Sequence, residues 1–264
     1  MVNRAGTPPG IDPAVPNQAR VYDYLLGGKD NYAADRAAVD EVLTAVPDAR
    51  RMARANRAFA MRAVAVLAGA GVRQFIDLGT GIPTSPSVHE VARRADPAAR
   101  VVYVDHDPVV QAHNEAKLAS DRRVSTVLAD IRRPELVIGH REVQRLIDFT
   151  EPVGVLCVAT LHLVRDEDDP AGIIARFRER MAPGSQLVVS QFCTDSDSAA
   201  TATLHAVDAG TPVETYFRST DEIHGFFDGL EMLPPGLVSV DEWRPDVPEA
   251  PTQLKIVGGV GRKA

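Results

Sequence analysis

Five short apolar runs alternate with segments of helical character after Gly71, and this alternation constrains the fold more than any other feature. The runs are residues 73–78, 101–105, 124–128, 153–159 and 186–192. They are apolar on both faces, which is typical of parallel strands buried between two layers of helices. Because crossovers between parallel strands are right-handed, the pattern predicts an α/β fold, a doubly wound sheet with helices on both faces.

The last part of the chain follows a different pattern. Residues 237–243 and 254–260 are two strand-like runs joined by a proline-rich loop, without a helix between them. Strands connected in this way lie antiparallel. We therefore expect a Rossmann-like, seven-stranded, mostly parallel sheet that ends in an antiparallel C-terminal hairpin.

The first seventy residues lie outside this sheet. Residues 1–16 are rich in proline and glycine, which predicts a flexible leader. Three helical patterns follow: one stops at Gly27-Gly28, one covers residues 34–45, and one runs from Pro47 to residue 68. The predicted organisation is a leader, a helical N-terminal lid or extension over residues 17–70, and a sheet domain over residues 71–264.

The net charge argues against nucleic acid as a partner. The chain has 36 acidic and 29 basic residues and a formal charge of -7, and a surface of that sign repels a phosphate backbone. A local cluster of arginines has the spacing of one side of a helix, and we interpret it as a solvated face. Its members are Arg50, Arg51, Arg54, Arg57 and Arg62.

Cysteine use and hydropathy indicate a cytoplasmic protein. Cys157 and Cys193 each lie in an apolar, β-prone run, which favours buried thiols over a disulfide. The N-terminal residues lack the apolar core of a signal peptide. The longest apolar stretches fall well short of the roughly 20 residues that span a bilayer, so no membrane association is expected.

The first run of the sheet leads into a glycine turn, Asp77-Leu78-Gly79-Thr80-Gly81. Neither glycine has a Cβ, so the backbone can turn sharply and approach a ligand closely. The turn lies at the carboxyl edge of the sheet, where open α/β sheets bind ligands. The second run ends at Asp105, followed by His106, and a carboxylate there can accept both ribose hydroxyls of a nucleoside.

Two details favour S-adenosylmethionine over a dinucleotide. The third glycine of a G-x-G-x-x-G pattern, which serves pyrophosphate binders, is Thr84 in this chain. Asp77 would repel a pyrophosphate, but it can pair with the amino group of a methionine moiety. The residues predicted to bind S-adenosylmethionine at these two strand ends are Asp77, Gly79, Thr80, Gly81, Asp105 and His106.

The ends of the third and fourth runs extend the predicted site. Asp130 can accept from an adenine amino group while Ile131 packs on the ring; the alternative is that Asp130 caps the following turn. The backbone of Ala159 and Thr160 is expected at the sulfonium end of the cofactor. His162 is the candidate catalytic base, with a structural histidine as the alternative. No metal site is expected.

The sequence also resembles a known group, the S-adenosyl methyltransferase family that was once listed as a domain of unknown function and is common in GC-rich bacteria. The resemblance covers nearly the whole chain from Asn17. It rests on residues 17–32, 56–57, 75–83, 103–108, 235–237 and 243–245. It implies a class I methyltransferase fold and S-adenosylmethionine binding, and it brings no settled acceptor.

The most specific of these motifs is residues 17–32, a tyrosine-rich segment that ends in Gly-Gly-Lys-Asp-Asn before Tyr32. Two aromatics, a lysine and an asparagine beside a glycine hinge suit a lid. After the fifth strand the family is expected to have a histidine, where this chain has Gln191, which cannot act as a base. The residues predicted to form the lid or the acceptor pocket are Tyr22, Tyr24, Lys29, Asn31, Gln191, Tyr216 and Arg218.

The expected function is S-adenosylmethionine-dependent, in-line methyl transfer to an unidentified small-molecule acceptor. The alternative from another class is a non-catalytic S-adenosylmethionine sensor that acts through a partner. An NAD-dependent oxidoreductase is disfavoured by Thr84. The helical N-terminal segment can instead serve for dimerisation, which would make the protein a homodimer.

Overall fold

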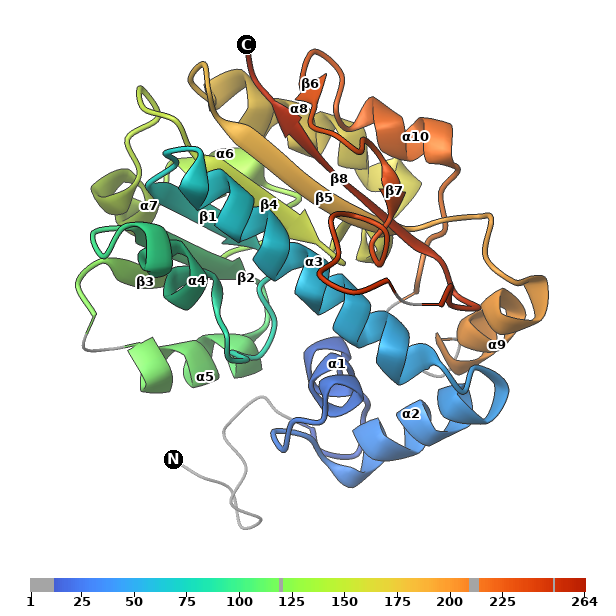
Figure 1. Cartoon of the computed structure of the whole chain (residues 1–264). Coiled ribbons are helices and arrows are strands. Elements are labelled where there is room, and N and C mark those ends of the chain that lie inside the picture. Colours follow the sequence, from blue (N-terminus) through green and yellow to red (C-terminus); the bar gives the residue numbers. More distant parts are fainter. Residues whose placement is uncertain (1–11, 119–120, 209–213, 249) are drawn as a thin grey trace.

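The computed structural model describes residues 12–118, 121–208, 214–248 and 250–264, and its centre is one mixed sheet (Figure 1). The strand order is β3-β2-β1-β4-β5-β8-β6, and β7 also pairs with β8. Strands β1 to β5 are parallel, whereas β8 is antiparallel to β5. The parallel strands are β1 (Gln74–Leu78), β2 (Arg100–Asp105), β3 (Val124–Leu128), β4 (Gly154–Val158) and β5 (Gln186–Phe192).

These five strands confirm the five apolar runs to within one residue at each end. Strands β1 and β5 are buried along their whole length. A strand covered on both faces must be apolar throughout, so its limits are visible in the sequence.

The C-terminal strands differ from the expected hairpin. β8 (Ile256–Arg262) is long, but its partners β6 (Glu231–Met232) and β7 (Val238–Ser239) have two residues each, which makes eight strands and not seven. Pro234 and Pro235 lie between β6 and β7 and have no N–H to donate to a ladder. The antiparallel pairing is confirmed, whereas a continuous strand over residues 237–243 is wrong.

Helices cover both faces of the sheet, as the doubly wound pattern predicts. One face packs against α3 and α4 through Phe75, Val101 and Leu156. The other face packs against α6, α7, α8 and α10 through side chains such as Ile76 and Val155. These helices are α3 (Ala49–Gly69), α4 (Val88–Ala95), α6 (Pro134–Ile138), α7 (Arg141–Leu146), α8 (Pro170–Arg180) and α10 (Thr220–Gly225); α5 (Pro108–Leu118) follows β2.

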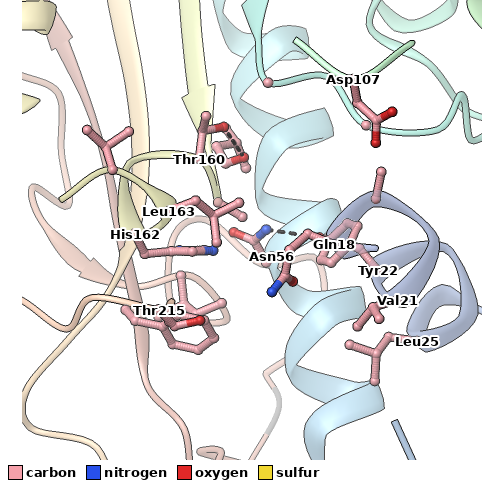
Figure 2. A pocket seen from close by; sticks show the side chains of 18 of the residues that line it. Gln18, Val21, Tyr22, Leu25, Asn56, Asp107, Thr160, His162, Leu163 and Thr215 are labelled. Atoms are coloured by element: carbon pink, nitrogen blue, oxygen red, sulfur yellow. Dashed lines mark hydrogen bonds between the residues drawn. The ribbon is translucent and has the colours of Figure 1, made fainter. Parts of the chain in front are cut away.

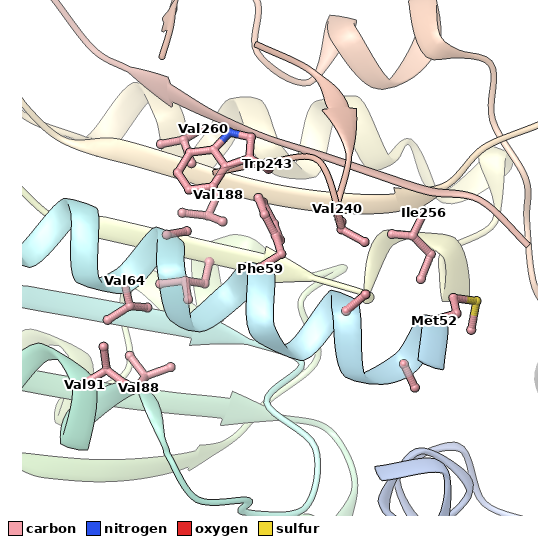
Figure 3. Close-up of a cluster of buried hydrophobic side chains, with 14 of the residues drawn as sticks. Met52, Phe59, Val64, Val88, Val91, Val188, Val240, Trp243, Ile256 and Val260 are labelled. Atoms are coloured by element: carbon pink, nitrogen blue, oxygen red, sulfur yellow. The ribbon is translucent and has the colours of Figure 1, made fainter. Parts of the chain in front are cut away.

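The first face has an aromatic contact at its centre, drawn in Figure 3. Phe59 of α3 and Trp243 meet edge to face, with ring centroids 5.4 Å apart and an interplanar angle of 89°. Both side chains are fully buried. Aromatic pairs in this geometry are stabilising, so the contact stabilises the packing of α3 against the C-terminal segment.

Three further helices gather at the carboxyl edge of the sheet: α1 (Gln18–Leu26), α2 (Ala33–Ala45) and α9 (Ser198–Asp208) (Figure 1). A buried ion pair joins the first two, with Arg20 Nε 2.7 Å from Asp35 Oδ2. Arg20 Nη2 also donates to the carbonyl oxygen of Val15 at 2.6 Å, which holds the described end of the predicted leader. Residues 1–11 of that leader lie outside the described residues.

The arginine cluster on α3 is not the solvated face that its spacing suggests. Arg54 alone among its members is exposed. The others donate to backbone carbonyls of distant segments and so tie α3 to its surroundings. The acceptors are Tyr24 for Arg50, Pro251 for Arg51, Thr84 for Arg57 and Val240 for Arg62.

Cys157 and Cys193 are buried free thiols, as expected, and burial raises the pKa of Cys157 to about 12. Within the described ranges, no helix combines the length and the apolar character needed to cross a membrane. In the same ranges, no three His, Cys, Asp or Glu side chains form a group that could hold a metal ion.

Candidate functional site

A cavity of about 650 Å³ lies where the parallel strands end, beneath α1, α2 and α9. Small-molecule sites in proteins have volumes of roughly 300–1,000 Å³. Figure 2 shows side chains from α1 and α3 on one side of it, opposite His162 and Leu163 of the short helix η1 (Leu161–Leu163). The helical extension thus forms a wall of the site and does not lie apart from it.

The glycine turn enters this cavity at the end of β1. Gly79 has φ +71, and a Cβ built on it would lie 2.6 Å from Oγ1 of Thr160. Thr160 is held there because its hydroxyl donates to the carbonyl of Leu78 at 2.9 Å. Gly81 has φ +65, and a Cβ on it would meet nothing within 4 Å. The turn therefore needs glycine at Gly79 for both backbone and space, and it is open at Gly81.

Asp105 ends β2 beside the turn, and 8% of it is exposed. Its Oδ2 accepts from the Gly81 backbone N–H at 2.9 Å, and its Oδ1 accepts from the Asp107 N–H at 3.0 Å. Burial raises the pKa of this carboxyl, and the two N–H groups oppose that effect. His106 follows, largely exposed, with Nδ1 3.7 Å from Asp105 Oδ1. A carboxylate at this strand end keeps lone pairs for a ligand, since each oxygen has two.

Asp77 and Arg57, two groups of opposite charge, both line the cavity. Asp77 is buried and accepts from the Thr80 hydroxyl at 3.1 Å. Burial raises the pKa of Asp77 to about 6, against the lowering effect of the Arg57 charge. Arg57 donates through Nη2 to Thr84 and Pro86, while its buried Nε has no partner among the described residues. An unpaired buried guanidinium N–H is a costly group that an anionic ligand can satisfy.

Asp130 and Ile131 follow β3 and line the cavity. The Asp130 carboxylate is engaged by Arg132, whose Nη2 lies 2.7 Å from Oδ2. Its Oδ1 also accepts from the Arg132 backbone N–H at 2.9 Å, the turn-capping contact that was the alternative for this residue. Ile131 is buried. The two residues therefore present an apolar surface beside a paired carboxylate.

His162 is 7% exposed and packs on Phe192, with ring centroids 4.7 Å apart. Burial lowers the pKa of His162 to about 3, and the nearby charge of Arg218 adds to this effect. The imidazole is therefore neutral at physiological pH, and its buried Nδ1 has no hydrogen-bond partner among the described residues. A group with so low a pKa is a weak general base.

A chain of buried polar contacts links the end of β4 to α1. The backbone N–H of Ala159 donates to the Ser190 hydroxyl at 3.0 Å, and that hydroxyl donates to Asn56 Oδ1 at 2.6 Å. Asn56 Nδ2 then donates to the Tyr22 hydroxyl at 3.0 Å. Ala159 has φ 54, a left-handed backbone conformation that is costly for a residue with a Cβ. These contacts fix Tyr22 as part of the cavity wall.

Several residues expected at the lid or acceptor pocket are not among the lining residues, namely Tyr24, Lys29, Asn31, Gln191 and Arg218. The Tyr24 ring lies under Arg50 at 4.5 Å, and the Asn31 amide donates to Asp23 at 3.0 Å. Gln191 donates to the Tyr216 carbonyl at 2.7 Å, and the buried Arg218 pairs with the exposed Asp166 at 2.7 Å.

Local structure explains the Gly-Gly-Lys-Asp-Asn motif that suggested a lid. The Asp23 carboxylate accepts from the Asp30 N–H at 2.9 Å as well as from Asn31. A Cβ on Gly28 would overlap that carboxylate. The motif is thus a loop wrapped around Asp23. Its neighbour Tyr22 does line the cavity, as does Tyr216, which hydrogen-bonds through its hydroxyl to Glu214 at 2.8 Å.

Gln18 and Arg57 are among the lining residues that were not identified as site residues from the sequence. Gln18 lies at the start of α1, and Figure 2 shows its amide extending into the cavity. Arg57 lies on α3 within a cluster that resembles a surface pattern. Each lies on a helix outside the sheet, so no strand end marks it. Their only signal in the sequence is their position inside the Asn17-Gln18 and Asn56-Arg57 motifs.

Comparison with known proteins agrees with this geometry. The chain matches the family model described as S-adenosyl methyltransferase over residues 4–264. It is 40% identical to a crystallised protein of Thermobifida fusca YX that carries a methyltransferase description, with a TM-score of 0.91 over 97% of this chain and 98% of that chain. A DUF574 family protein from Streptomyces avermitilis MA-4680 is 38% identical, with a TM-score of 0.91 over 95% and 98%. No curated protein matches the chain.

A more distant likeness concerns the fold alone. An S-adenosylmethionine-dependent methyltransferase from Anabaena variabilis ATCC 29413 is 13% identical, with a TM-score of 0.50 over 74% of this chain and 78% of that chain. Fold and family together define the class, a Rossmann-like enzyme that uses S-adenosylmethionine to transfer methyl groups. The chain belongs to the S-adenosyl methyltransferase family.

Proposed function

We propose that this methyltransferase acts on a small molecule, which shares the cavity with S-adenosylmethionine. The observation that carries the proposal is the cover over the strand ends, where α1, α2 and α9 form walls of a cavity of about 650 Å³. A pocket of this volume suits a ligand of drug-like size. A macromolecular acceptor would need an open groove that reaches the methyl group.

The residues at the strand ends fit the nucleoside half of S-adenosylmethionine. Asp105 retains acceptor capacity after its two backbone contacts, which suits the two ribose hydroxyls. The open space at Gly81 leaves room for the ligand above the turn. Ile131 supplies an apolar surface for the adenine ring, and the neighbouring Asp130 carboxylate can accept from the adenine amino group.

The other half of the ligand is a zwitterion, and the cavity wall carries the matching charges. The buried Asp77 carboxylate suits the methionine amino group. The unpartnered Nε of Arg57 suits the methionine carboxylate. Both pairings satisfy groups that are costly when buried alone. The backbone of Ala159 and Thr160 then faces the sulfonium.

S-adenosylmethionine supplies an electrophilic methyl group on a good leaving group. The chain contributes position: the turn and Asp105 fix the nucleoside, and the helical cover excludes water from the reacting atoms. Holding two reactants in line can lower a barrier by about 7–11 kcal/mol. Residues that orient the acceptor therefore matter more here than a strong acid or base.

Asp105→Ala tests the cofactor assignment. We expect S-adenosylmethionine binding to weaken by about 1–3 kcal/mol, because ligand hydroxyls lose their partner. Calorimetry measures the change, and Asp246→Ala, at an exposed position, is the matched control. Unchanged affinity in a folded Asp105→Ala protein would refute the ribose assignment.

Turnover on small molecules is tested by incubating the protein with labelled S-adenosylmethionine and a metabolite extract. An enzyme transfers labelled methyl groups into the extract, whereas a non-catalytic S-adenosylmethionine sensor transfers none.

A further inference from the structure

The cavity extends beyond the glycine turn into a compartment that we call the acceptor chamber. It is defined by six lining side chains, each at most 9% exposed: Leu25, Val39, Val42, Met52, Leu254 and Ile256. They come from α1, α2, α3 and the C-terminal segment that leads into β8. None carries an oxygen or nitrogen in its side chain. Removing a charged or strongly polar body from water into such surroundings is costly, so the chamber favours an apolar body.

The helices that form most of the chamber contribute no charge to the cavity lining. The lining residues from α1, α2, α9, β5 and β8 include no charged side chain in the part of the chain that the structure describes. The lining arginines, Arg57, Arg132 and Arg165, come from α3 and from the loops after β3 and β4, and Glu214 precedes Tyr216. A carboxylate or phosphate on the acceptor would therefore meet no counter-charge from α1, α2 or α9.

Two polar side chains reach the chamber from opposite walls. Figure 2 shows the Gln18 amide on the α1 side and the His162 imidazole across from it, with Tyr22 and Asn56 beside Gln18. The Gln18 amide makes no hydrogen bond to any residue within the described ranges. Tyr22 and Asn56 are already paired with each other at 3.0 Å. Gln18 and the unpartnered imidazole nitrogen of His162 thus keep hydrogen-bonding capacity toward an acceptor, as far as the described residues show.

Resting on the proposed function, we propose that the acceptor is an uncharged small molecule with an apolar body and an aromatic amine, whose N–H groups donate to Gln18 and His162. The two hydrogen bonds orient the nitrogen so that its lone pair points toward the end of the cavity that holds the cofactor. An aromatic amine is neutral at physiological pH, whereas an aliphatic amine would enter as a cation.

The reaction balances without a base in the chamber. The amine lone pair forms the bond to the methyl carbon as the carbon–sulfur bond breaks, and that bond's electron pair stays on sulfur. The positive charge passes from sulfur to nitrogen, and the methylated amine loses its proton to water when it leaves the cavity. A hydroxyl would have to lose its proton during attack. His162, which reaches the chamber, is a poor acceptor for that proton, because burial lowers its pKa to about 3.

A matched set of probes tests the proposal on the full chain. The set is 4-ethylaniline, 4-ethylphenol, 4-ethylbenzoate and 4-ethylbenzylamine, which share one apolar body and differ in the polar group. Binding is measured in the presence of S-adenosylhomocysteine, and methyl transfer with labelled S-adenosylmethionine. We expect 4-ethylaniline to bind at least about tenfold more tightly than the anionic and cationic probes, and to be methylated in preference to the phenol.

Variants link this preference to the two polar side chains. Gln18→Ala and His162→Ala should each weaken 4-ethylaniline binding about 3- to 10-fold, while S-adenosylhomocysteine affinity stays within about twofold. Gln253→Ala, at an exposed position outside the lining, is the control. Preference for 4-ethylbenzoate, methylation of the phenol alone, or no binding of any probe beside S-adenosylhomocysteine overturns the acceptor class. Failure of S-adenosylhomocysteine itself to bind overturns the proposed function.

Discussion

Asp77 is a buried carboxylate whose ionisation is unfavourable in the free protein. Burial raises its pKa to about 6, so the free protein loses stability as the pH rises through 6 and the buried group ionises. A cationic amino group beside Asp77 would reverse this and favour the ionised form. Binding should therefore release a proton in this range, and affinity should fall as the pH drops below 6.

This gives a prediction for Asp77→Asn. At pH 8 the variant should unfold at a higher temperature than the wild type, because no buried charge remains. Its affinity for S-adenosylmethionine should be lower and lack the decline below pH 6. Calorimetry from pH 5 to 8 and thermal unfolding measure both effects. A wild-type affinity that stays level across pH 6 would contradict the pairing of Asp77 with the amino group.

The two glycines of the turn predict a second contrast at residue scale. Both have left-handed backbone, and only Gly79 faces Thr160. Gly81→Ala should cost about 1–2 kcal/mol of unfolding free energy for the backbone alone. Gly79→Ala should cost clearly more, because its Cβ overlaps Thr160. Urea denaturation of the pair measures the difference; equal losses would show that Thr160 moves aside freely.

At the scale of residues, the sequence located side chains at or just after the carboxyl ends of buried strands. Asp77, Asp105 and Asp130 line the cavity because a strand end fixes where each lies. Gln18 and Arg57 come from helices whose placement depends on tertiary packing, which no local pattern encodes. Asn31, by contrast, was expected at the lid or acceptor pocket, whereas its amide donates to Asp23 within the same loop.

At the scale of elements, α1 is held in place by buried charge as well as by apolar contact. Arg20 and Asp35 are 3% and 0% exposed. Arg20→Met should destabilise the protein by about 3–5 kcal/mol, because it leaves a buried carboxylate without its partner. Replacing both residues, as in Arg20→Met with Asp35→Asn, should recover part of that loss, because the amide is uncharged and its oxygen can still accept from the backbone N–H of Asn17 or Tyr32.

Urea denaturation measures these variants. Arg176→Met removes one partner of an exposed pair with Glu179, at 58% and 63% exposure, and serves as the control. It should change the unfolding free energy by less than about 1 kcal/mol. If Arg20→Met were as mild as this control, the ion pair would not hold α1 against α2.

The N-terminal helices were predictable from their period of apolar residues, and the parallel strands from their short, continuous apolar runs. The C-terminal strands were less so. β6 and β7 have two residues each, too few to show a period, and Pro234 and Pro235 separate them. The solvated-face interpretation of the α3 arginines was wrong because spacing shows which residues share a side, and it does not show what packs there.

At the scale of the whole molecule, the cover and the sheet share one cavity, so ligand binding and stability are linked. S-adenosylhomocysteine at 100 times its dissociation constant should stabilise the native state by about 2.7 kcal/mol. At about 2–4 °C per kcal/mol for a large domain, the melting temperature should rise by about 5–10 °C. Thermal unfolding with and without the ligand checks this, and no shift at saturation would argue against binding to the folded state.

The sequence predicted the helical and sheet-forming segments of the molecule better than the way these segments pack against one another. A helical N-terminal part and a sheet domain were both expected. That α1, α2 and α9 meet over the strand ends follows from contacts between segments far apart in the chain, such as Asn17 with Asp107 at 2.6 Å. Such contacts leave no signature in a single sequence.

Trp243 can serve as an intrinsic fluorescence probe of one defined region of the protein. It is the one tryptophan of the chain, fully buried against Phe59 of α3 and absent from the cavity lining. Its fluorescence emission therefore reports on the packing between α3 and the C-terminal segment. Direct quenching by a ligand in the cavity is not expected. Because α3 also carries Asn56 and Arg57, any change of fluorescence on ligand addition would register a movement of that helix.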